Sequence, residues 1–89
     1  MKRLAWQGKL NAHQAVELAK AVDPWQGEPR IELDLSGVTE LDAAIFRVIV
    51  GLARQVWSWN GELVLLRPQA PVRKLLASSG LDQAVEVTL

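Results

Sequence analysis

The stretch Arg30-Ile-Glu-Leu-Asp-Leu-Ser-Gly-Val-Thr-Glu-Leu-Asp-Ala-Ala-Ile-Phe46 decides the fold of this 89-residue chain. Apolar and polar residues alternate over 31–35, which predicts a strand with one buried face. Ser36-Gly37 is expected to end that strand, because both residues favour turns. Asp42 is a good N-cap, so a long apolar helix is expected to begin at Ala43. The positive end of that helix would then point outward at the carboxyl end of the strand, where small α/β domains usually meet a ligand or partner.

The segment after Asp42 has the apolar spacing of a helix and is expected to run from Ala43 to about Ser58. The residues expected to face the sheet are Ile45, Ile49, Leu52 and Val56. The residues on the opposite side are Arg47, Gly51, Arg54 and Ser58. A second apolar row at the border between them consists of Phe46, Val50, Ala53 and Trp57. Asn60-Gly61 is typical of a left-handed helix end.

Two shorter elements are expected before this strand. Leu4–Trp6 predicts a short first strand, with Gly8 as a break. Asn11 followed by Gln14 is a variant of the capping box and predicts the start of a helix. The expected apolar stripe of that helix is Ala12, Ala15, Val16, Ala19 and Val22, with Leu18 at its border. Asp23-Pro24 is expected to end it.

Three further elements are expected after the long helix. Leu63–Leu66 is a short apolar run typical of a buried strand. Pro71 suits the first turn of a third helix, and Gly80 suits its end. Val85–Leu89 alternates and predicts a last strand.

Composition is that of one small globular domain over residues 1–89, with 49% hydrophobic residues. Ten basic and ten acidic residues cancel, so neither nucleic acid nor an anionic membrane is favoured as a partner. The chain has no cysteine, which excludes disulfides and cysteine-bound zinc. No segment has the length of a bilayer span or the pattern of a signal peptide. We therefore expect a cytoplasmic protein that does not insert into a membrane.

The order of the elements also predicts the architecture. Helices that alternate with strands favour a parallel sheet. Polar residues recur, however, at alternate strand positions: Glu32, Asp34, Glu86 and Thr88. A sheet covered on both faces would need apolar residues there. We therefore expect a two-layer α/β domain with about four mostly parallel or mixed strands and three helices on one face, the other face being at least partly wet.

These pieces resemble the STAS domains, the family named after sulfate transporters and anti-sigma-factor antagonists. The residues that carry the resemblance are Leu33-Asp-Leu-Ser-Gly-Val38, Leu41-Asp42, Gly61-Glu-Leu-Val-Leu-Leu66, Pro71-Val-Arg-Lys-Leu-Leu76 and Ser79-Gly-Leu-Asp82. The resemblance covers nearly the whole chain from about Gly8 and implies the layout just described. Ile45 stands where the family usually has glycine, so Ile45 and Phe46 are expected to make this corner bulkier and more apolar.

The resemblance implies a non-catalytic protein-interaction module. In STAS domains that antagonise anti-sigma factors, a partner kinase phosphorylates a Ser or Thr at the position of Ala43, and the added charge breaks the complex. Alanine has no hydroxyl, so this switch is expected to be absent. The implied partner is an anti-sigma factor with a kinase fold, or the ATPase of a lipid-transporting ABC system whose small companion subunit is a lone STAS domain. The sequence leaves open whether two copies form a homodimer.

The surface expected to bind the partner is the N-terminus and the exposed side of helix 43–58. Its residues are Asp42, Ala43, Ala44, Phe46, Arg47, Val50 and Arg54. The border row with Trp57 has two interpretations. It packs against neighbouring helices, or it forms a binding stripe in which aromatic residues beside arginines anchor an interface.

Catalysis, a cofactor and a metal site are not expected. His13 is the only histidine, and its place on the polar side of a helix indicates a solvated side chain. No nucleophile elbow or phosphate-binding loop occurs. One alternative is a nucleotide- or anion-binding site in which Asp34 and Asp42 hold a bridging metal beside the helix N-terminus. The simpler interpretation makes Asp34 a solvent-facing strand residue and Asp42 a helix cap.

Overall fold

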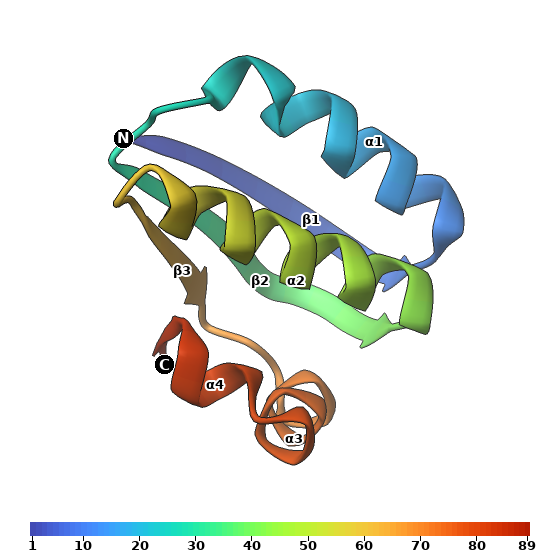
Figure 1. Cartoon of the computed structure of the whole chain (residues 1–89). Coiled ribbons are helices and arrows are strands. Elements are labelled where there is room, and N and C mark those ends of the chain that lie inside the picture. The colour runs from blue at the N-terminus through green and yellow to red at the C-terminus, as the bar shows by residue number, and fades with distance from the viewer.

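A computed structural model describes all 89 residues (Figure 1). The strands are β1 (Lys2–Leu10), β2 (Arg30–Leu41), β3 (Glu62–Leu66) and β4 (Glu86–Thr88). The helices are α1 (Ala12–Val22), α2 (Ala43–Ser58), α3 (Ala70–Ser79) and the single turn α4 (Leu81–Ala84), with a 3-10 turn at Asp23–Trp25. None of these helices combines the length and the apolar character needed to cross a membrane.

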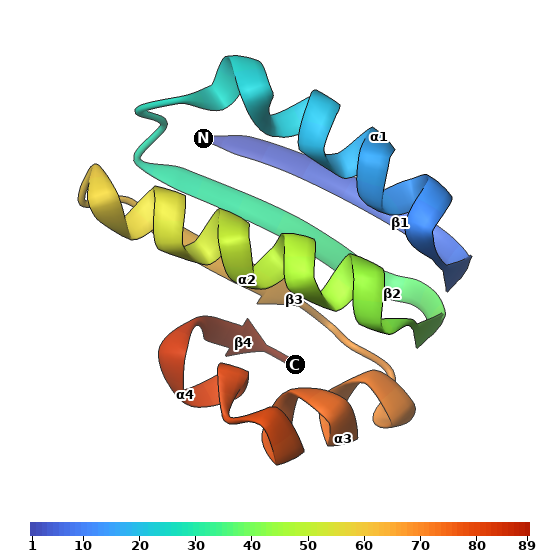
Figure 2. The same ribbon diagram turned by 45° about the vertical axis from the view of Figure 1, so that its right-hand side comes forward.

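The four strands form one parallel sheet whose order follows the chain, β1-β2-β3-β4. Crossovers between parallel strands are right-handed, and each one here moves a strand further in the same direction. All the helices therefore lie on one face of the sheet. Figures 1 and 2 show α2 in the middle of this helical layer, with α1 on one side and α3 and α4 on the other. The predicted two-layer α/β architecture is confirmed.

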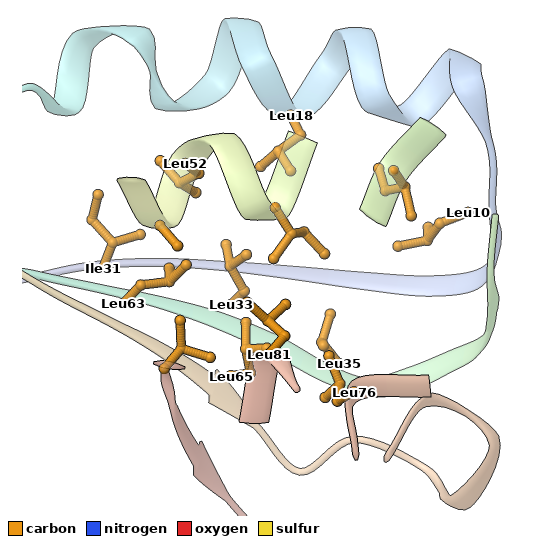
Figure 3. Close-up of a cluster of buried hydrophobic side chains, with 14 of the residues drawn as sticks. Leu10, Leu18, Ile31, Leu33, Leu35, Leu52, Leu63, Leu65, Leu76 and Leu81 are labelled. Atoms are coloured by element: carbon orange, nitrogen blue, oxygen red, sulfur yellow. The ribbon is translucent and has the colours of Figure 1, made fainter. Parts of the chain in front are cut away.

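The core lies between the helical layer and the sheet (Figure 3). The sheet contributes Ile31, Leu33 and Leu35 from β2 and Leu63 and Leu65 from β3. Helix α2 contributes the four residues predicted from its spacing, Ile45, Ile49, Leu52 and Val56. The cluster also includes Leu18 of α1, Leu76 of α3 and Leu81 of α4. Each such side chain contributes about 1.5–3 kcal/mol when fully buried, so α2 is fixed firmly above β2 and β3.

The opposite face of the sheet carries a network of ion pairs. Arg30 contacts Glu32 at 2.9 Å, Glu62 of β3 at 2.9 Å and Glu86 of β4 at 3.4 Å. Arg3 of β1 reaches the same Glu32 at 2.8 Å, and this glutamate is only 5% exposed. The hydrogen bonds from Arg3 and Arg30 hold the pKa of the Glu32 carboxyl below its usual value. The polar face is thus a bonded network that links all four strands.

The two long strands extend further than the sequence predicts. β1 covers Lys2–Leu10 instead of Leu4–Trp6, and Ser36-Gly37 does not end β2, which continues to Leu41. At two places β2 advances one residue more than its partner β1, and these bulges keep the two strands paired.

Gly37 shows why the turn signal is misleading. A Cβ at this position would lie 2.8 Å from Gln7 Cγ and 3.1 Å from the carbonyl oxygen of Trp6. The glycine therefore serves the close approach of β1 and β2 at a bulge, and it does not end the strand.

Helix α1 begins as predicted but buries a different stripe. Asn11 Oδ1 accepts a hydrogen bond from the His13 N–H, and the side chain of Gln14 accepts one from the Asn11 N–H. The buried residues of the helix are Ala15, Leu18 and Val22. Val16 is 56% exposed, and Ala12 and Ala19 are exposed as well, so the predicted stripe is right for Ala15 and Val22 and wrong for these three residues. Leu18 replaces them because the spacing 15, 18, 22 brings the largest side chain onto the sheet.

Candidate functional site

The N-terminus of α2 is exposed at the end of β2. Asp42 caps the helix, because its Oδ1 accepts a hydrogen bond from the Ile45 N–H at 3.1 Å. The Asp42 N–H donates to the carbonyl of Leu10 at 3.0 Å, which ties the corner to the end of β1. Asp42 and Ala43 are exposed, and Ala44 is half-buried. The corner therefore presents the positive end of the helix dipole on a small surface with few side-chain atoms.

Further along α2, the outward side carries both charge and apolar surface. Arg47 and Arg54 are exposed, whereas Phe46 and Val50 are half-buried. Ile45 is completely buried, so the expectation that it adds apolar surface to this corner is wrong. Its side chain points to the sheet, and Phe46 alone supplies the bulk at the surface.

An open groove of about 250 Å³ lies between α2 and the corner formed by α3 and α4, and we call it the α2–α4 groove. Its first wall consists of Phe46, Val50, Ala53, Arg54 and Trp57 of α2. Its second wall consists of Ser79, Gly80, Leu81 and Ala84. The packing interpretation of the border row is confirmed for Ala53, and the binding interpretation stays a prediction. Ala53 is 1% exposed and packs into the core, whereas Trp57 stays 44% exposed.

Positive charge gathers on two of the helices, α2 and α3. Helices α2 and α3 carry four cations and no acidic residue, namely Arg47, Arg54, Arg73 and Lys74. None of the four makes an ion pair. The strands, by contrast, hold Glu32, Asp34, Glu40, Glu62 and Glu86, and each of these acids is paired. Helices α2 and α3 are thus basic, whereas α1 and α4 carry the acids Glu17 and Asp82.

Asp34 and Asp42 do not come together. Asp34 lies on the polar face of the sheet, where it accepts hydrogen bonds from the Ser36 N–H at 2.9 Å and from Arg67 Nη2 at 2.6 Å. The Ser36 bonds, and then Arg67, hold the pKa of the Asp34 carboxyl below its usual value.

β2 continues to Leu41 between the two aspartates, so eight residues at a rise of about 3.3 Å each separate them by roughly 25 Å. No group of three or more potential metal ligands occurs in the chain. The predicted site on Asp34 and Asp42 is therefore wrong, and Asp42 acts as a cap. His13 is exposed in the first turn of α1, with its Nε2 3.5 Å from Glu17 Oε1, as expected for a solvated histidine.

The sequence did not reveal the second wall of the groove. Helix α4 is a single turn, which is too short to show a periodic pattern, and residues 81–84 were not assigned to any element. The one available signal was Gly80, whose φ of +80° ends α3 and redirects the chain. The helical spacing predicts Trp57 in the border row, and the predicted binding surface omits it, although it is the one exposed aromatic side chain.

Comparison with known proteins gives consistent matches. The family model described as "Mlab, STAS domain" matches residues 2–88. BtrV of Bordetella bronchiseptica, described as a candidate anti-sigma factor antagonist, is 37% identical over 78 residues. That match covers 83% of this chain and 66% of the relative, so the chain spans just under two thirds of the length of BtrV.

Solved structures give the same picture. The crystal structure of a candidate anti-sigma factor antagonist from Thermotoga maritima superposes with a TM-score of 0.88 at 27% identity. This match covers 98% of the present chain and 77% of the other chain. The anti-sigma factor antagonist SpoIIAA in its unphosphorylated form superposes with a TM-score of 0.83, covering 98% of this chain and 78% of that one. At 19% identity SpoIIAA supports the fold alone.

Proposed function

Because the chain belongs to the STAS domain family, we propose that it is a non-catalytic interaction module that regulates a protein partner by binding it through the N-terminus and exposed face of α2. The observation that carries the proposal is the state of this face. Arg47 and Arg54 are exposed without ion-pair partners, and Trp57 is the one exposed aromatic residue. Trp and Arg are the residues most enriched at the energetic centres of interfaces.

The proposed partner is an anti-sigma factor with a kinase fold. BtrV and the protein from Thermotoga maritima support this choice, since both are described as candidate anti-sigma factor antagonists. A second candidate is the ATPase of a lipid-transporting ABC system. It is retained because the matching family model is described by the name Mlab.

The proposed complex differs from the family's usual one in its regulation. Ala43 is the first residue of α2 and is exposed at the corner, where the family resemblance places the phosphorylated hydroxyl. A methyl group cannot receive a phosphate. We infer that the partner is not released by phosphorylation of this chain at residue 43.

Charge reversal on α2 tests the proposed surface. The chain and its Arg47→Glu variant are assayed by calorimetric titration against each anti-sigma factor and each ABC ATPase encoded in the source genome. Arg47 makes no ion pair within the domain, so the variant is expected to keep its melting temperature and to lose about tenfold or more in affinity. Lys20→Glu, an equivalent reversal on α1, is the control. Equal losses for both variants, or no loss for Arg47→Glu, would refute this surface.

The absence of the phosphate switch has its own test. The chain and an Ala43→Ser variant are incubated with the cognate kinase and ATP, and intact masses are measured. The Ser variant is expected to gain one phosphate and to lose the partner, whereas the natural chain gains none. A phosphate on the natural chain would contradict the inference.

A further inference from the structure

We propose that the α2–α4 groove receives an acidic amphipathic helix of the protein partner. The inference rests on the proposed function, because α2 belongs to both surfaces. It adds the element that is recognised and the chemistry of the segment that fits.

The shape of the groove fits a helix. Its anchors on α2 are the half-buried Phe46 and Val50 and the exposed Trp57, which follow one another at spacings of four and seven residues. At about 1.5 Å per residue this row is roughly 16 Å long, which matches three turns of a partner helix. The facing wall offers the small residues Gly80 and Ala84, which leave room for incoming side chains. Helix-in-groove recognition uses apolar anchors with this kind of spacing.

The position of α2 in the layer explains why this side is open. In Figure 2 α2 lies between α1 and the α3–α4 corner. The lining residues place the groove of about 250 Å³ on the side of α2 that faces this corner. Trp57 is 44% exposed there, although a tryptophan has a large apolar surface to bury. A helix in the groove would cover this ring and the half-buried Phe46 together.

The arginines beside the groove favour an acidic occupant over a basic one. Arg54 lines the groove, Arg47 lies one turn before Val50, and neither has an ion-pair partner. Arg54 is the one charged residue that lines the groove, whereas Arg73 lines a separate hollow together with Asp82 of α4. A basic helix would be repelled, whereas carboxylates on the rims of an acidic helix would pair with Arg47 and Arg54.

A second copy of this chain cannot supply such a helix. Its helices α2 and α3 have no acidic residue, and α1 has a single acid, Glu17. The complementary segment therefore belongs to a different protein.

The experiment uses two synthetic helical peptides of about 15 residues, long enough to hold a helix. Both present leucines on one face, and they carry either glutamates or lysines on the rims. Each is titrated into the ¹⁵N-labelled chain. The glutamate peptide is expected to bind about tenfold tighter or better than its lysine twin. It should shift the Trp57 indole signal and the amide signals of Val50 and Leu81, and salt should weaken its binding.

One pair of variants places the site. Ala84→Phe fills the groove from the exposed face of α4, and Ala19→Phe adds the same side chain to the cleft between α1 and α2. Ala84→Phe is expected to weaken the binding of the glutamate peptide and of the anti-sigma factor by about tenfold. Ala19→Phe is expected to change neither affinity. Should Ala84→Phe fold poorly, Ala84→Glu serves the same purpose through repulsion of the acidic helix.

The outcomes separate this inference from the proposed function. Equal affinity for the two peptides, signal shifts away from the groove, or unchanged partner binding by Ala84→Phe would overturn the groove inference. The last of these results would leave the binding of a partner through α2 standing. If the natural chain binds no anti-sigma factor and no ABC ATPase, the proposed function fails, and the groove inference fails with it.

Discussion

Removing the cap of α2 should weaken the whole domain by a predictable amount. In an Asp42→Ala variant the Ile45 N–H loses its partner at 3.1 Å, while the backbone bond from residue 42 to Leu10 can remain. Replacing an N-cap carboxylate by alanine costs about 1 kcal/mol, within a range of 0.5–2. Ile45 in the first turn is completely buried, so fraying there would expose core surface and favours the upper part of that range. For a domain of this size, 1 kcal/mol lowers the melting temperature by roughly 4–8 °C.

Denaturant unfolding measures this loss directly. The chain contains four tryptophans, so fluorescence can follow the transition. The slope of the free energy against denaturant should stay constant, because the variant exposes the same surface on unfolding. Asp42→Asn is the matched control, since asparagine caps helices as well as aspartate does, and it should stay within a few tenths of a kcal/mol of the natural chain.

Two results would refute this reasoning. If Asp42→Ala changed the free energy of unfolding by less than about 0.3 kcal/mol, the cap would not hold the first turn of α2. If Asp42→Asn lost as much as Asp42→Ala, the charge of residue 42, and not its hydrogen bond, would be the stabilising feature.

Other substitutions have effects of known sign. A Cβ at Gly51 would meet nothing within 4 Å, so Gly51→Ala should stabilise α2 by about 0.5–1 kcal/mol in the same unfolding assay. At Gly61 a Cβ would lie 2.9 Å from the carbonyl oxygen of Glu28 and 2.8 Å from Trp59 Nε1, so Gly61→Ala should destabilise by about 1–3 kcal/mol; equal effects for the two glycines would contradict the packing. The lowered pKa of Asp34 adds stability above its unfolded pKa of about 3.9, and that stability is lost as the pH falls through the lower folded value. The advantage of the natural chain over Asp34→Asn should therefore shrink on acidification, and a constant difference would show that the Asp34 ion pair does not contribute.

Local patterns predicted the centre of the domain well. The spacing of Ile45, Ile49, Leu52 and Val56 gave the buried face of α2, and Asp42 and Asn60 gave its two ends. These signals succeed because one helix stripe and two caps depend on neighbours within a few residues. The same holds for the capping box of α1.

Features that depend on a second element were predicted poorly. Ser36-Gly37 has the composition of a turn, yet it lies inside β2, since Gly37 makes room for Gln7 of β1. Val16 and Leu18 exchanged roles on α1, because the sheet selects which of two neighbouring stripes is buried. No residue within either segment indicates which distant residues that segment will contact.

The sequence likewise predicted only one of the two walls of the candidate site. The α2 residues were found because a helical wheel separates them, but the wall at Gly80 and Ala84 comes from a corner more than twenty residues away. Asp34 and Asp42 appeared as a pair only as long as β2 was expected to end between them. Extending the strand by six residues moved them apart.

The topology also indicates why a partner should meet the helices and not the open sheet. Because the strands follow chain order, one face of the sheet carries no helix and could in principle bind another protein. Its acids, however, are already paired with Arg3, Arg30 and Arg67, so a partner there would have to break existing ion pairs for each new one. The arginines of α2 make no ion pair within the domain. An acidic partner therefore gains charge pairs on the helical layer without losing any within the domain, and there it also finds the one exposed aromatic ring, that of Trp57.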